Sequence, residues 1–207
     1  LALGGGLPLS NQNILVEAAG TGSQVSGGSV PETITSSVKR TVNIASDIGL
    51  NTRIVYSIGP FANTGPLPPK AETETTYTII WSATNSSNDV TGTVMKATLP
   101  SYVNWLGASV PLSETVAFDP ISRTVTWNIG DLRAGTGFVS AAREVSFQVS
   151  FLPSLSQVGQ GPNIVNQTTI SGRDKFTNAF LEQSRPALTT RLGTDPIYKN
   201  GDEKVAP

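Results

Sequence analysis

The sequence contains no cysteine and no histidine. Without cysteine there is no disulfide framework and no thiolate nucleophile, so the fold must depend on its hydrophobic core. Without histidine the chain lacks the commonest general base and the commonest metal ligand. We therefore expect a protein that is not an enzyme, with no catalytic residues and with no metal or other cofactor.

Charge is also scarce, because charged residues make up 14% of the chain against about 25% in an ordinary soluble domain. The 14 Lys+Arg and 15 Asp+Glu are nearly balanced, and no basic cluster offers the positive surface that nucleic acids require. No apolar run approaches the ~20 residues of a membrane span, so we expect no membrane insertion. Hydroxyl and amide residues must cover the surface instead, which favours an extracellular, cell-surface β-protein.

What the sequence does contain is alternation of apolar and polar residues. Residues 75–85, TTYTIIWSATN, place Tyr77, Ile79, Trp81 and Ala83 on one side and mainly hydroxyl residues on the other. Strict alternation indicates a half-buried β-strand. Two aromatic rings give this strand enough apolar area to anchor a core. Residues 144–152, EVSFQVSFL, repeat the pattern.

Shorter alternating runs predict further strands, separated by the turns that 20 Gly and 14 Pro provide. These strands are expected at residues 33–45, 52–58, 93–99, 102–106, 114–118, 124–129, 165–170 and 187–192. About eight to ten short strands predict an all-β fold, an immunoglobulin-like β-sandwich with an extended N-terminal segment. The expected organisation is an N-terminal segment (1–35), the sandwich (36–192) and a polar C-terminal tail or linker (193–207).

The N-terminal segment carries a short apolar strand between Gly-rich stretches. Ile14, Val16 and Ala18 alternate with their neighbours, and Leu15 adds a further apolar side chain. One interpretation is an edge strand of the same sandwich, because consecutive strands usually lie close together. The other is a strand that is donated to the sheet of a neighbouring molecule. These four residues are the candidate assembly strand.

Several motifs in the middle of the chain resemble a known family. They are a Tyr-Thr-Ile strand start, a Thr-Asn turn, a strand ending in Leu-Pro, an Asp-Pro hairpin with Thr-Val-Thr-Trp, a hydrophobic strand and a preceding Gly-Pro-Leu-Pro-Pro, at residues 77–79, 84–85, 99–100, 119–127, 145–149 and 65–69. Together they resemble the conserved-repeat, immunoglobulin-like domains of prokaryotic, chiefly bacterial, cell-surface proteins. The resemblance covers about residues 50–192. It implies a stalk, adhesin or envelope module, and it brings no shared catalytic residues.

Four acidic residues are the candidates for a carboxylate pair of the kind that a glycosidase uses: Asp119, Asp131, Glu144 and Asp174. Asp119 is followed by Pro120 at the start of a turn. Asp131 and Asp174 lie in Gly-containing loops, where Asp is common. A structural role explains these positions better than catalysis.

Three further positions are candidates for contact with sugars. Asn85 and Asn166 begin Asn-x-Ser/Thr acceptor patterns and are candidate glycosylation sites. Trp81 and Trp127 are in phase with the aliphatic residues of their strands, which indicates core packing. Trp105 lies in less regular sequence and is the candidate ligand contact.

The sequence thus predicts a non-enzymatic extracellular structural protein. We expect a subunit or module of a cell-surface appendage, filament or envelope layer. Its partners would be copies of itself or neighbouring domains of the same surface protein, joined in the sharper hypothesis by β-strand donation. The alternative is a carbohydrate-binding or adhesin stalk module of a larger surface protein, with surface glycans as its partners.

Overall fold

The computed structural model describes residues 10–24 and 32–207, which form thirteen strands and one short 3₁₀ helix, η1 (Leu155–Gln157). This confirms the all-β prediction. The strands are β1 (Asn13–Gln24), β2 (Glu32–Asn43), β3 (Ile48–Val55), β4 (Thr75–Asn85), β5 (Val90–Thr98), β6 (Val103–Val110), β7 (Thr115–Asp119), β8 (Thr124–Leu132), β9 (Arg143–Phe151), β10 (Asn163–Val165), β11 (Thr168–Asp174), β12 (Phe180–Arg185) and β13 (Leu188–Thr189).

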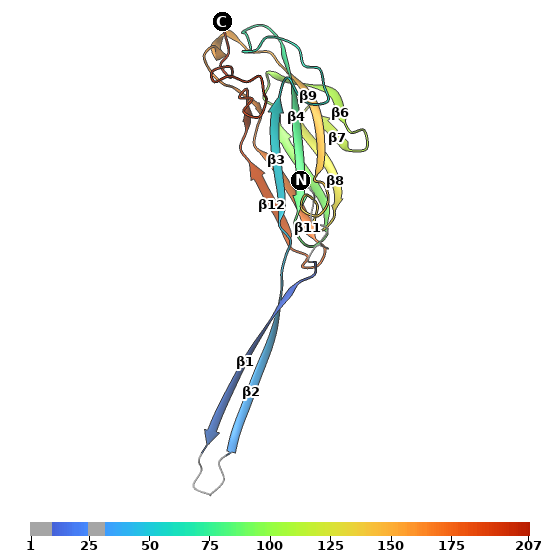
Figure 1. Ribbon diagram of the computed structural model, residues 1–207, viewed down its shortest axis with the longest axis vertical. Coiled ribbons are helices and arrows are strands. Elements are labelled where there is room, and N and C mark those ends of the chain that lie inside the picture. Colours follow the sequence, from blue (N-terminus) through green and yellow to red (C-terminus); the bar gives the residue numbers. More distant parts are fainter. Residues whose placement is uncertain (1–9, 25–31) are drawn as a thin grey trace.

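Two antiparallel sheets form the body of the molecule, with strand orders β12-β11-β5-β8-β7 and β3-β4-β9-β6 (Figure 1). A third, two-stranded sheet pairs β10 with β13. The predicted anchor strand is β4, which pairs with β3 and β9 inside the four-stranded sheet. Trp81 of β4 packs edge-on against Phe147 of β9, with ring centroids 5.0 Å apart, and both side chains are fully buried. The core therefore forms around the residues whose alternation marked them.

The first two strands lie outside the sandwich. β1 and β2 form an antiparallel ribbon, here called the arm, with a register that runs from Asn13 opposite Asn43 to Gln24 opposite Glu32. The arm projects from one end of the body (Figure 1). Within the described residues β1 pairs only with β2, so the prediction of an edge strand of the sandwich is wrong. Alternation shows that a strand has an apolar face, but it does not show what covers that face.

The boundaries expected at both ends of the chain differ from the structure. Residue 35 falls inside β2, so the N-terminal element reaches beyond the expected segment. The Gly-rich stretches at 1–9 and 25–31 lie outside the described residues. At the other end Val205 is buried, and the backbone of Ala206 bonds to Ala71 and Pro69. The last residues thus pack on the far end of the sandwich instead of extending from it.

Candidate functional site

The arm has two chemically different faces. Residues that are directly opposite in an antiparallel ribbon share a face, and successive residues alternate between faces. One face therefore combines the pairs Ile14/Val42, Val16/Arg40 and Ala18/Val38. We call Ile14, Val16, Ala18, Val38 and Val42 the apolar face of the arm. Arg40 is the single charged residue among these three pairs.

The opposite face of the arm is mainly polar, although Leu15, which is 59% exposed, also lies on it. Glu17 and Lys39 lie opposite each other there and form an ion pair of 3.3 Å. Both side chains are about half exposed, so the pair is screened by water and adds little stability. Its opposite charges nevertheless favour the observed register, because like charges in directly opposed positions are unfavourable.

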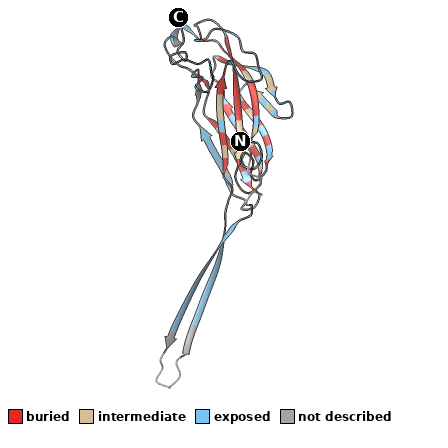
Figure 2. Cartoon of the chain, in the orientation of Figure 1, coloured by how far each residue is buried: buried red, intermediate tan, exposed pale blue. Residues whose placement is uncertain are grey.

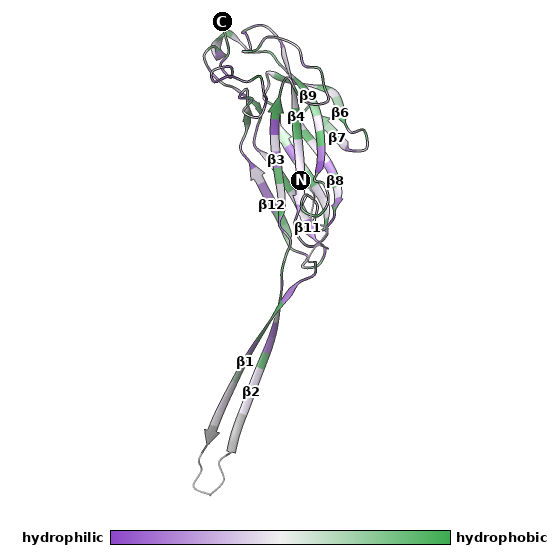
Figure 3. Ribbon diagram, viewed as in Figure 1, coloured by the Kyte–Doolittle hydropathy of each residue, from purple (hydrophilic) through white to green (hydrophobic). Residues whose placement is uncertain are grey.

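The apolar face is uncovered. Ile14, Val16, Val38 and Val42 are 50–53% exposed, and Figure 2 shows the described arm residues as exposed along both strands. Figure 3 shows hydrophobic positions on the arm, away from the sandwich core. A single two-stranded ribbon is at best marginally stable in water. Covering the apolar face would therefore be expected to stabilise this ribbon.

Asn88 fastens the base of the arm to the sandwich. Its Oδ1 accepts a hydrogen bond from the backbone N–H of Asn11 (2.7 Å), on the β1 side. Its Nδ2 donates to the backbone carbonyl of Ile44 (2.8 Å), on the β2 side. One side chain thus binds the chain at its entry to the arm and at its exit. The sequence offers no indication of this role for Asn88, because nothing in a turn sequence shows which distant backbone a side chain reaches.

Asp174 holds the side chain of Asn88 in place. Its Oδ2 accepts hydrogen bonds from Asn88 Nδ2 (2.9 Å) and from the backbone N–H of Ser46 (2.6 Å). Its Oδ1 accepts from the N–H groups of Phe176 and Thr177, both at 2.8 Å. Burial by itself would raise the pKa of Asp174, but these four hydrogen bonds to the carboxylate outweigh it and lower the pKa below its ordinary value. Asp174 is a buried structural anion.

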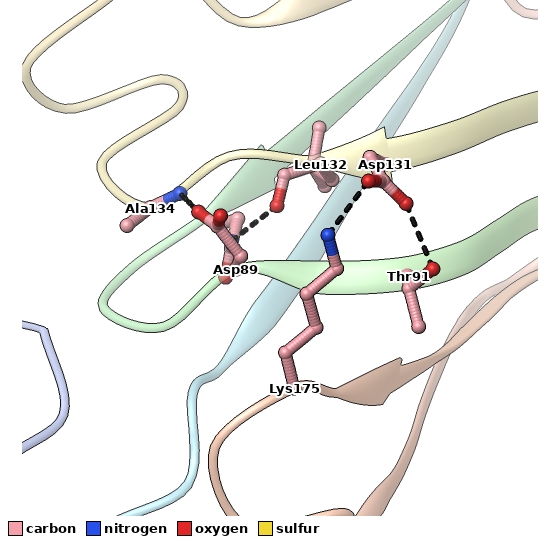
Figure 4. Close-up of polar contacts among 7 residues, drawn as sticks. Asp89, Thr91, Asp131, Leu132, Ala134 and Lys175 are labelled. Atoms are coloured by element: carbon pink, nitrogen blue, oxygen red, sulfur yellow. Dashed lines mark hydrogen bonds and ion pairs between the residues drawn. The ribbon is translucent and has the colours of Figure 1, made fainter.

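A shallow cavity of about 370 Å³ opens beside the base of the arm, lined by Ser10, Asn11, Asp89, Ala134, Lys175 and Phe176. Figure 4 shows the polar contacts on its sandwich side. Lys175 Nζ pairs with Asp131 Oδ2 at 2.7 Å, and Thr91 Oγ1 donates to Asp131 Oδ1 at 2.7 Å. The hydrogen bond from Lys175 lowers the pKa of Asp131. Asp131 lies at the end of β8 and Thr91 at the start of β5, so this exposed cluster ties the residue after β11 to two neighbouring strands.

The remaining acids are also occupied by structural contacts. Asp119 accepts hydrogen bonds from Ile121 N–H (2.9 Å) and Ser122 Oγ (2.7 Å), which closes the predicted turn. Glu144 pairs with Arg53 at 3.4 Å on the surface. The four candidate carboxylates thus hold different partner sets. Among the described residues no group of three His, Cys, Asp or Glu side chains has a metal-binding arrangement.

The two glycosylation candidates differ in accessibility. Asn85 is fully buried, and its Nδ2 donates to the carbonyls of Asn88 (2.7 Å) and Leu132 (2.9 Å). A glycan cannot be accommodated on this amide in the folded protein, so the prediction for Asn85 is wrong. Asn166 is half-buried, and its Nδ2 donates to Thr98 Oγ1 at 2.9 Å. Its modification stays a prediction.

Trp105 packs more than the sequence suggested. Its ring stacks on Phe118 of β7, with centroids 6.0 Å apart, and tilts against Phe147 of β9 at 5.1 Å. Trp105 is partly buried at the side of the sandwich where β6 and β7 are the edge strands. Its contact with a sugar stays a prediction, while its packing role is visible.

Comparisons with known proteins place the chain near several solved surface proteins at low similarity. No family model and no curated protein matches the sequence. The BcpA major pilin subunit of Bacillus cereus, in its D312A form, aligns with a TM-score of 0.42 and 13% identity over 82% of this chain and 47% of that chain. The major pilin SpaD of Corynebacterium diphtheriae aligns with a TM-score of 0.38 and 14% identity over 68% and 35%.

A third solved structure, the C-terminal domain of the AgI/II polypeptide BspA from Streptococcus agalactiae, aligns with a TM-score of 0.34 and 10% identity over 82% and 57%. The chain thus spans about half the length of the first of these structures, 47% of the BcpA chain. In the part of the chain that is described, no helix is long and apolar enough to cross a membrane.

Proposed function

We propose that this chain is a non-enzymatic structural subunit of an extracellular, cell-surface assembly such as a filament, appendage or envelope layer, and that the arm joins one subunit to the next. The observation that carries the proposal is the arm itself. It is a ribbon with twelve residue pairs, one apolar face in solvent and a base fixed by a buried polar side chain.

Two physical arguments favour assembly through this element. The free energy falls when another surface covers exposed apolar area, and it falls when another strand pairs with a free strand edge. The fixed base also keeps the arm extended from its own body, so less conformational entropy is lost when it binds. Attachment by Asn88 therefore suits an element that acts between molecules.

The test is removal of the arm. Residues 14–42 are replaced by two glycines that join Asn13 to Asn43, which are paired neighbours at the base. The buried core begins beyond the arm, at Ser46 and Ile48, so the sandwich is expected to fold without it. We expect the full chain to form assemblies in electron microscopy and sedimentation, and the shortened chain to stay monomeric. Equal assembly of both chains would refute the proposal.

A further inference from the structure

The two sides of the sandwich differ in how their edges are protected. On one side the edge strands β3 and β12 are linked, because Arg185 Nε donates to the carbonyl of Leu50 at 3.0 Å. Glu182 and Arg185 also place exposed charges on β12. Charged residues on an edge strand oppose pairing with another chain. This side is closed to further strands.

The other side is open. There the edge strands are β6 and β7, and within the described chain no hydrogen bond joins one to the other. β6 carries a bulge between Trp105 and Ser109, which makes it a poor template. β7 has a regular register with β8, and its central residues Val116, Ala117 and Phe118 carry no charge. β7 is the unprotected edge.

Apolar side chains lie partly exposed around this edge. Val116 and Phe118 of β7 are half-buried against the core, and Trp105 stacks on Phe118. Nearby in sequence Leu106 is 43% and Leu112 is 93% exposed. An additional strand beside β7 would cover part of this area and satisfy the free backbone groups of the edge in the same step.

We propose that β7 of one subunit accepts β1 of another copy of this chain, so that the arm extends the five-stranded sheet of its neighbour. This deepens, and rests on, the proposed role of the arm in assembly. β1 has the matching pattern, because Ile14, Val16 and Ala18 recur at every second residue, as the inward residues Val116 and Phe118 do on β7.

The charges of the arm decide which of its strands pairs. β1 carries only Glu17 in its apolar stretch, whereas β2 carries Lys39 and Arg40 side by side. With β1 against β7, β2 becomes the new outer edge, and its adjacent cations oppose further strand addition. The joined sheet then ends after seven strands, the five of the body plus the two of the arm.

The acceptor must be a second molecule. The arm extends away from its own sandwich (Figure 1), and the contacts of Asn88 hold it there, so β7 of the same chain is out of reach. Arm and acceptor are different surfaces, so the contact is head-to-tail. Such contacts continue from copy to copy and form open chains or rings.

Because the chain has no cysteine, single introduced cysteines test this contact directly. With the apolar face inward, Leu15, Glu17 and Ala19 of β1 would lie on the same outer face as Ala117 of β7. One preparation carries Leu15→Cys, Glu17→Cys or Ala19→Cys, and the other carries Ala117→Cys. The two are mixed and oxidised. The matched control is Ser184→Cys, an exposed position on the protected edge strand β12.

We expect at least one arm cysteine to form a mixed disulfide with Ala117→Cys in at least tenfold higher yield than with Ser184→Cys, measured by intact mass. Equal yields, or no disulfide under conditions where the unmodified chain assembles, would overturn the inference. If assembly still requires the arm in that case, the proposed function stands and the arm binds elsewhere. If removal of the arm leaves assembly unchanged, the proposed function and this inference fall together.

Discussion

The side-chain amide of Asn88 donates a hydrogen bond to the carboxylate of Asp174, 2.9 Å away, and both side chains are buried. Asn88 also bonds to the backbone of Asn11 and Ile44 on the two sides of the arm. Asp174 in turn bonds to Ser46, just beyond the arm. The arm is therefore joined to the sandwich through side-chain hydrogen bonds as well as through the chain itself.

We expect Asn88→Ala to loosen the arm. The substitution removes three hydrogen bonds, one of them to the buried carboxylate of Asp174. We expect this to cost about 1–3 kcal/mol. Urea unfolding should show this loss, and hydrogen exchange should show faster exchange of the arm amides. Asn166→Ala is the control, because among the described residues that half-buried side-chain amide donates to Thr98 alone. If the two variants lost equal stability and the arm amides kept their exchange rates, the role of Asn88 would be refuted.

The lowered pKa of Asp174 predicts loss of stability in acid. Its folded-state pKa lies below the unfolded value of about 3.9, so the unfolded chain binds the proton first as pH falls. The stabilisation is complete above the unfolded pKa and is lost as pH falls through the folded one. Asp174→Asn should be less stable than the unmodified chain at neutral pH, because the amide group adds donors among the N–H groups that face it.

The measurement is the free energy of unfolding in urea from about pH 6 to about pH 2, across the carboxylate range. The difference in free energy of unfolding between the unmodified chain and Asp174→Asn should be constant above the unfolded-state pKa of Asp174. It should become smaller below that pKa. Other acids titrate in both proteins, so the difference isolates Asp174. A gap that stayed constant through this range would contradict the assignment.

The two faces of the arm should respond differently to charge. Val16→Asp places a carboxylate on the apolar face opposite Arg40, where the opposite charges would support the ribbon itself. Leu15→Asp places the same group on the polar face at a similarly exposed position. We expect Val16→Asp to reduce assembly strongly and Leu15→Asp to reduce it little, as measured by sedimentation. The reverse order would show that the other face binds.

The sequence predicted the interior well, because burial leaves a period of two in a strand that has one face in the core. Tyr77, Ile79, Trp81 and Ala83 are all fully buried, as their alternation indicated. The prediction that this strand is half-buried is wrong, because Thr76, Thr78 and Ile80 on its other face are buried as well. The sequence did not predict β12, because a strand with little burial has no such period. It is an edge strand with most residues exposed, so its sequence FLEQSR carries no such period.

Polar positions were harder to predict. Asn85 and Asn88 occupy sequence typical of a surface turn, yet both are buried. Their side-chain amides bond to backbone from three other parts of the chain, at Asn11, Ile44 and Leu132. Asp174 likewise looked like an ordinary loop acid. The destination of a side-chain hydrogen bond depends on tertiary contacts between residues far apart in the sequence, and no local pattern records it.

Two tyrosines in contact provide a last test of how this core is stabilised. The ring centroids of Tyr56 and Tyr77 lie 6.2 Å apart. Of their two hydroxyl groups, only that of Tyr56 has a hydrogen-bond partner among the described residues, the carbonyl of Gly65 at 2.7 Å. Burial of the Tyr77 hydroxyl raises its pKa, so it stays neutral, and it makes no hydrogen bond within the described chain. Tyr77→Phe should therefore leave the Tm unchanged or raise it. Tyr56→Phe should lower stability by about 1 kcal/mol, the value of one hydrogen bond. A larger loss in Tyr77→Phe than in Tyr56→Phe would show that the buried hydroxyl is bound in solution.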